Sequence, residues 1–175
     1  MTSKLKTDVL ETVSGSGTIA LTNQLSGMTY ESMAVGSVIQ VVTNTHTQSS
    51  HVSTTSTSYV ALGSSFELAI TPKYANSLII CEIHLGMQYN STAASSLISV
   101  ITKAGSAMSS SGYGSAYNRV NGSGYYSSVS LREFDVAGGT SAITYGMSFL
   151  CGHGTSVYGY HQNSAYNITL TEIKQ

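Results

Sequence analysis

Two pairs of side chains are spaced so that each pair would share one face of a strand. Glu133 and Asp135 lie two residues apart, as do Glu82 and His84, and alternate residues of a strand point to the same side. Paired carboxylates serve glycoside hydrolysis, and an acid beside an imidazole could transfer protons. Structural roles explain both pairs more simply, with Glu133 and Asp135 forming a solvated strand end beside Arg132 and Glu82 with His84 making polar contacts.

No established catalytic or metal-binding motif accompanies these pairs. The sequence holds no nucleophile elbow, metalloprotease helix or phosphate-binding loop. Cys81 and Cys151 lie far apart without a C-x-x-C motif, so we expect buried free thiols, with a disulfide between neighbouring strands as the alternative. Four histidines lie in polar or Gly-rich segments and are expected to be exposed in loops: His46, His51, His153 and His161. We therefore expect no enzyme, no metal ion and no cofactor.

Tyrosine gives the more specific signal. The chain has twelve Tyr, three Phe and no Trp, and several of the tyrosines lie in stretches rich in Ser, Gly and Asn. Antibody paratopes favour the same residues, because Tyr supplies rigid contact area and the small polar residues supply adaptable hydrogen bonds. The candidate receptor-binding residues are Tyr113, Tyr117, Asn118, Tyr125, Tyr126, Tyr158 and Tyr160. Alternatively, these tyrosines pack loops onto the domain or meet at a subunit interface.

Charged residues are scarce, at 9% of the chain against about 25% in typical globular proteins. Seven basic and eight acidic residues give a formal net charge of −1, which argues against binding to nucleic-acid phosphates. A surface with little self-repulsion favours self-association. No apolar run approaches the ~20 residues that span a bilayer, and no secretory signal is evident. We expect no membrane insertion, and synthesis in a cytoplasm.

The pattern of apolar residues divides the chain near residue 36. Residues 1–36 contain too few apolar side chains to close a core, whereas residues 37–175 read as short strands separated by turns. This predicts an all-β fold, an antiparallel β-sandwich head preceded by a short extended segment. Strands are expected at 37–44, 66–71, 78–87, 97–102, 125–136, 143–151 and 166–173. Residues 43–58 and 106–126 are expected to form long polar loops, which are often functional.

The beginning of the chain and several segments of the head resemble structural proteins of tailed phages. Residues 3–21 read SKLKTDVLETVSGSGTIAL, an opening similar to that of tail-fibre and related proteins of marine and cyanobacterial tailed phages. Residues 35–42, 70–80 and 167–173 are similar to segments of the C-terminal heads of those proteins. The resemblance implies a non-enzymatic virion component, usually a homotrimer with a jelly-roll-like head.

The same resemblance implies what each part would contact. Residues 1–36 would join other tail or capsid proteins of the virion, and the head would bind a host-surface glycan or protein. The candidate attachment residues are Leu5, Val9, Leu10, Ile19 and Leu21. Because almost no shaft separates the opening from the head, the alternative is a capsid fibre, decoration or connector protein with a purely structural role. A glycan-cleaving enzyme using Glu133 and Asp135 is the third alternative.

Overall fold

The computed structural model describes residues 29–90, 95–119, 125–153 and 156–175, and of residues 87–90 only the backbone. The chain divides into two compact units, Met1–Met33 and Ala34–Gln175. In the described part of the first unit, residues Tyr30–Ser32 form one turn of 3-10 helix, η2. No helix among the described residues is long and apolar enough to cross a membrane.

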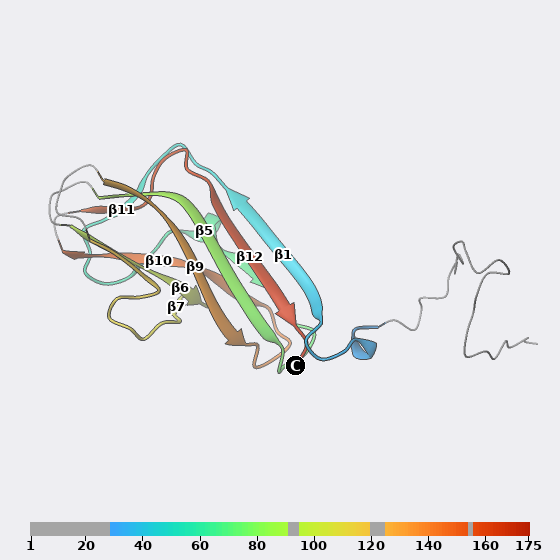
Figure 1. Ribbon diagram of the computed structural model, residues 1–175. Coiled ribbons are helices and arrows are strands. Elements are labelled where there is room, and N and C mark those ends of the chain that lie inside the picture. The colour runs from blue at the N-terminus through green and yellow to red at the C-terminus, as the bar shows by residue number, and fades with distance from the viewer. Residues whose placement is uncertain (1–28, 91–94, 120–124, 154–155) are drawn as a thin grey trace, which may run out of the picture. The chain divides into compact units, whose positions relative to one another are not determined.

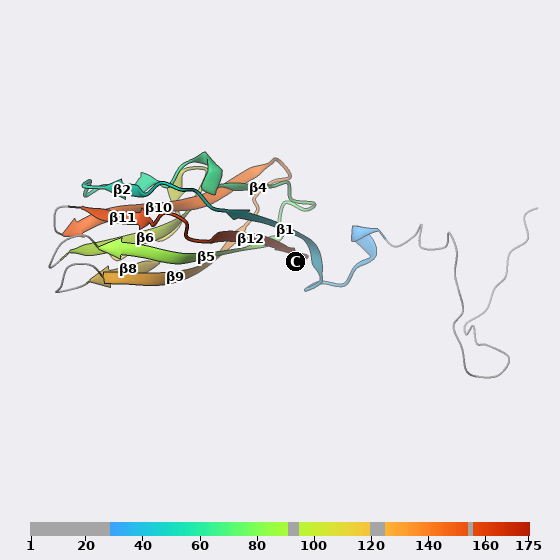
Figure 2. The same ribbon diagram turned by 90° about the horizontal axis from the view of Figure 1, so that it is seen from above.

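The second unit consists of two antiparallel sheets that lie face to face as a β-sandwich (Figure 1; Figure 2). Sheet A contains β1 (Val38–His46), β12 (Tyr166–Ile173), β5 (Leu78–Asn90), β9 (Tyr125–Val136), β11 (Val157–Tyr160) and β2 (Val52–Thr54). Sheet B contains β3 (Val60–Ala61), β4 (Leu68–Ile70), β10 (Ile143–His153), β6 (Ser96–Lys103), β7 (Ser106–Ala107) and β8 (Ala116–Arg119). A second 3-10 turn, η3 (Ser64–Phe66), lies between β3 and β4 in the chain.

Each sheet is organised around long central strands. In sheet A, β9 pairs along one edge of β5, while β12 and then β11 pair along the other, so the order across the sheet is β1-β12-β5-β9 at one end and β2-β11-β5-β9 at the other. In sheet B, β10 and β6 pair centrally, β4 and β3 follow the free edge of β10, and β7 and β8 follow that of β6.

The predicted all-β, antiparallel fold is confirmed, and most predicted strands are present to within three residues at each end. The strand predicted at 66–71 is shorter, because Phe66 belongs to η3 and only Leu68–Ile70 pair. The prediction of long loops at 43–58 and 106–126 was wrong in part. β1 extends to His46, and β2, β7 and β8 lie within the stretches 43–58 and 106–126. These edge strands bury little side-chain area, and therefore lack the apolar alternation by which a strand is recognised.

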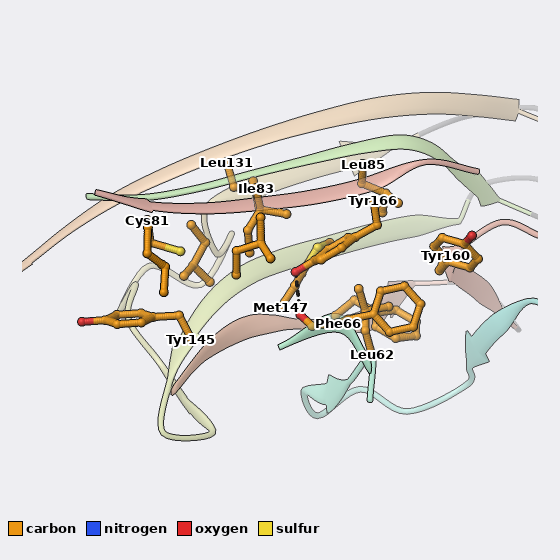
Figure 3. Close-up of a cluster of buried hydrophobic side chains, with 14 of the residues drawn as sticks. Leu62, Phe66, Cys81, Ile83, Leu85, Leu131, Tyr145, Met147, Tyr160 and Tyr166 are labelled. Atoms are coloured by element: carbon orange, nitrogen blue, oxygen red, sulfur yellow. Dashed lines mark hydrogen bonds between the residues drawn. The ribbon is translucent and has the colours of Figure 1, made fainter. Parts of the chain in front are cut away.

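The core fills the space between the sheets (Figure 3). The inward face of β5 is buried, as is most of the inward face of β10, of which only Ile143 is partly exposed. These inward residues are Ile79, Cys81, Ile83 and Leu85 on β5, and Tyr145, Met147, Phe149 and Cys151 on β10. Tyr166 reaches across from β12, and its hydroxyl donates to the carbonyl oxygen of Phe66 at 2.7 Å.

The two cysteines are free and buried, as expected, and lie in opposite sheets. Burial, with the negative charges of Glu133 and Glu82 adding to it, raises the pKa of Cys81 to about 12. Burial also raises the pKa of Cys151. Because only the thiolate is strongly nucleophilic, both residues act as small apolar core side chains.

Candidate functional site

The carboxylate pair of β9 faces sheet B, where both members have partners. Ser115 donates to Glu133 at 2.6 Å, and the Tyr145 hydroxyl donates to Asp135 at 2.6 Å. The Lys103 ammonium also lies 2.6 Å from Asp135. Both carboxylates are partly exposed near the end of β9, but Arg132 is not their partner, because the alternation of β9 puts Arg132 on the other face and turns Glu133 and Asp135 toward the seam between the sheets.

A third carboxylate, Glu172, has a structural role that sequence reasoning missed. Its side chain is fully buried, and it accepts hydrogen bonds from Gln40 Nε2 at 2.6 Å and from the backbone N–H groups of Lys73 and Tyr74 at 2.8 and 3.3 Å. Burial alone would raise the pKa of Glu172, but the hydrogen bonds it accepts hold that pKa below its usual value. The sequence signal for this role is the alternation of Tyr166, Ile168 and Leu170 in β12, which puts Glu172 at the next inward position.

The exposed tyrosines of the second unit gather toward one end of that unit. There β9 begins and β10 ends, opposite the end that carries the C-terminus and the start of β1 (Figure 1). Four of the predicted binding residues are exposed: Tyr113 (65%), Tyr117 (42%), Tyr125 (52%) and Tyr126 (51%). Tyr158 is partly exposed on β11. We call this region, with these five residues, the tyrosine end.

Two predicted binding residues do not belong to that surface. The prediction that Tyr160 binds a receptor was wrong, because Tyr160 is fully buried. The pairing of β11 with β2 shifts register between Tyr158 and Tyr160 and turns Tyr160 inward. Its hydroxyl donates to the Ser164 carbonyl at 2.6 Å, and its ring packs edge-on against Phe66. Asn118 is half-buried and donates to the Ser127 hydroxyl, which ties β8 to β9 across the seam.

Aromatic side chains at the tyrosine end contact one another edge-on. The rings of Tyr113 and Tyr117 lie 5.0 Å apart between centroids. A second series runs from Tyr126 to His161 (5.2 Å), from His161 to His51 (4.5 Å) and from His51 to Tyr158 (4.9 Å). Such contacts hold the rings in place while leaving Tyr126 half-exposed.

Only some of the histidines are exposed as expected. His51 and His153 are exposed, and His161 is partly buried in the turn after β11. The prediction that His46 is exposed in a loop was wrong, because His46 lies in β1 and packs edge-on against Phe66 at 4.6 Å between ring centroids. Within the described residues, no group of three or more His, Cys, Asp or Glu side chains is placed to hold a metal ion.

A groove that carries several polar side chains lies on the outer face of sheet A, and sequence reasoning found only part of it. Its volume is about 370 Å³, and its polar lining comes from two neighbouring cross-strand rows, Thr169–Glu82–Arg132 and Asn167–His84–Ser130. Arg132 Nε lies 3.4 Å from a Glu82 carboxylate oxygen, and His84 Nδ1 lies 2.9 Å from the Ser130 hydroxyl. We call it the sheet groove. The Glu82–His84 spacing was visible in the sequence, whereas its partners depend on strand register.

Next to the sheet groove, toward the end where β1 begins, the same face becomes largely apolar. Two cross-strand rows, Val38–Ile173–Leu78–Val136 and Val41–Thr171–Ile80–Phe134, follow from the register. We call them the apolar rows. Val38, Val41, Phe134 and Val136 are each at least half exposed. Contiguous exposed apolar area of this kind commonly marks an interaction surface.

Comparison with known proteins leaves the relationships of the chain open. No protein-family model matches it, and no curated protein matches it. The candidate attachment residues Leu5, Val9, Leu10, Ile19 and Leu21 lie outside the described residues.

Proposed function

We propose that the protein is a virion component of a tailed phage, a short tail fibre or adhesin that attaches through residues 1–36 and binds the host surface through the tyrosine end. One observation carries this proposal. The exposed tyrosines lie at one end of the sandwich, and the chain enters β1 at the other, where Gly36 donates to the Lys174 carbonyl at 2.8 Å. An anchored domain would therefore present its tyrosines outward.

We further propose that the head is a jelly roll. This is supported by the strand orders β1-β12-β5-β9 in sheet A and β4-β10-β6-β7 in sheet B. Apart from the β6–β7 hairpin, neighbouring strands in these orders are distant in the chain, as a doubled Greek key produces. Jelly rolls occur in viral capsid and lectin domains. The architecture thus suits a virion protein that binds without catalysing a reaction.

Binding at the tyrosine end would rest on stacking and hydrogen bonds with a glycan or protein rather than on ion pairs. The five tyrosines that define this end carry no formal charge at neutral pH, and contacts through stacking and hydrogen bonds vary little with salt. In a homotrimer, three weak sites on one particle would gain affinity from being presented together.

Host adsorption tests this proposal. The fluorescently labelled full chain should bind host cells, and the double variant Tyr113→Ser, Tyr117→Ser, or the single variant Tyr126→Ser, should weaken binding about tenfold or more, the scale of an aromatic hot spot. Tyr30→Ser is the matched control, because Tyr30 is an exposed tyrosine outside the tyrosine end. Unchanged binding by both tyrosine-end variants would contradict the adhesin proposal.

A capsid fibre, decoration or connector protein is the second candidate. The apolar rows suit packing against a neighbouring subunit in this case as in a trimeric adhesin. Reconstruction of the virion distinguishes the two candidates. An adhesin leaves Tyr113 and Tyr126 facing solvent at the tip of a fibre, whereas a structural protein buries the tyrosine end between subunits.

A further inference from the structure

We propose that the sheet groove is a binding site for a neutral sugar, separate from the tyrosine end. The site lies on the open face of sheet A, between the apolar rows and the tyrosine end. It uses the paired strands β5, β9 and β12, and so depends on the sheet rather than on loops. A volume of about 370 Å³ falls within the range of small-molecule sites.

The groove offers both donors and acceptors, which is what a sugar hydroxyl needs, because each hydroxyl donates one hydrogen bond and accepts others. The Glu82 carboxylate accepts, and the Arg132 guanidinium donates. Thr45 donates to Asn167 Oδ1 at 2.8 Å, so the amide NH₂ of Asn167 remains as a donor at the groove. The contact of His84 Nδ1 with Ser130 likewise leaves His84 Nε2 for a ligand.

The planar groups suit pairs of adjacent hydroxyls. A carboxylate or a guanidinium can make two parallel hydrogen bonds to neighbouring polar atoms, and adjacent hydroxyls on a sugar ring present such atoms. Arg132 is held on two sides, since its guanidinium carbon lies 5.1 Å from the centroid of the Phe134 ring and its Nε contacts Glu82. Binding would therefore require little ordering of the long Arg132 side chain.

The charge of the groove favours a neutral ligand. Glu82 and Arg132 have opposite formal charges and lie side by side, so their two charges offset each other. An anionic sugar or a phosphate would face Glu82 without a surplus of cations. Both side chains are about half exposed, so they keep much of their hydration and can exchange water for hydroxyls at modest cost.

Glycan binding by the full chain tests the site. We would probe an array of neutral oligosaccharides ending in galactose, glucose, mannose or N-acetylglucosamine, with sialylated and uronic-acid glycans as charged comparators, and titrate the strongest ligand by calorimetry. We expect a neutral ligand, and a loss of affinity of about tenfold or more in Arg132→Ala and in Glu82→Gln, the scale of a charged hydrogen bond.

Three controls make the result specific. Arg119→Ala removes an exposed arginine outside the groove and should keep full affinity. Circular dichroism should show that both groove variants are folded. Tyr126→Ser should bind the sugar normally, so that failure of the tyrosine end and failure of the sheet groove give different results.

Several outcomes would overturn the proposal. These are the absence of any neutral ligand on the array and in titrations at millimolar sugar, a preference for the acidic glycans, or retained affinity in both groove variants. A change in oligomeric state of Arg132→Ala, measured by light scattering, would instead identify the groove as a contact between copies of the chain.

Discussion

At the residue scale, the negative charge of Glu172 is stabilised inside the protein. Its carboxylate is buried and accepts hydrogen bonds from one side chain and two backbone N–H groups. Those backbone groups belong to the segment between β4 and β5, so the charge joins β12 to that connection. Hydrogen bonds to a charged group contribute more than neutral ones, and their loss leaves buried groups unsatisfied.

This arrangement predicts a pH-dependent stability. Folding lowers the pKa of Glu172, so its contribution is complete above the ordinary carboxyl pKa of about 4.3 and is lost as the pH falls through the lowered value. Glu172→Gln should reduce the free energy of unfolding at pH 7 by about 1–3 kcal/mol. In urea titrations, the difference from the original chain should shrink as the pH is lowered toward about 3.

Glu82→Gln is the matched control for that experiment. Its carboxylate is about half exposed and lies in a surface ion pair, so the change should cost under about 1 kcal/mol. A deficit in Glu172→Gln that stays the same at both pH values would show that the charge of Glu172 is not responsible.

At the element scale, β9 serves two surfaces at once. Its inward positions meet sheet B through Ser127, Glu133 and Asp135, and its outward positions carry Arg132 and Phe134. As the edge strand of sheet A, it borders the seam between the sheets. Polar groups there can be partly hydrated and still bond across the seam, which explains why carboxylates occupy inward positions.

Two substitutions on β9 should therefore differ in their effect on stability. Asp135→Ala removes the acceptor of the largely buried Tyr145 hydroxyl and the partner of Lys103, and should lower the free energy of unfolding by about 1–3 kcal/mol. Arg132→Ala, three residues earlier on the opposite face, should cost under about 1 kcal/mol. Thermal and urea unfolding of both variants provide the measurement, and equal losses would contradict this account of β9.

The same strand shows which features the sequence could predict. Alternation predicted that Glu133 and Asp135 share a face. Apolar alternation along β5 and β10 likewise indicates a buried side, because those strands cross the whole core. The sequence could not indicate which face of β9 is inward, since its inner positions are partly polar. Nor could it reveal the sheet groove, because bringing Asn167 beside His84 requires the register of β12 against β5.

Tyr160 illustrates a different limit. The Tyr, Gly and Ser residues around Tyr160 in the sequence led to the prediction of a binding residue, and nearby Tyr158 is partly exposed. A single register shift in β11 turns Tyr160 inward. The neighbouring Gly159 lets the Phe149 ring pack against β11, because a Cβ at residue 159 would overlap that ring. Such shifts depend on the packing of both sheets and leave no local pattern.

At the scale of the whole head, the outer face of sheet A changes character along its length. The apolar rows lie at the end where β1 begins, the sheet groove follows, and Tyr126 and Tyr158 lie toward the far end. This order fits a head that assembles near its base and binds near its tip. The low charge of the chain adds little repulsion between copies.

Assembly through the apolar rows is therefore the prediction for the whole molecule. Light scattering on the purified full chain should give a trimer of about 55 kDa, three times the 18.3 kDa chain. The trimer should persist at high salt, because burial of apolar area is not screened by ions. The double variant Phe134→Ser, Val136→Ser should shift the mass toward that of a monomer at micromolar concentration. The control is Tyr113→Ser, an exposed aromatic outside the rows, which should remain trimeric. A monomeric original chain would contradict the trimer, whereas a double variant that stays trimeric would place the interface elsewhere than on the apolar rows.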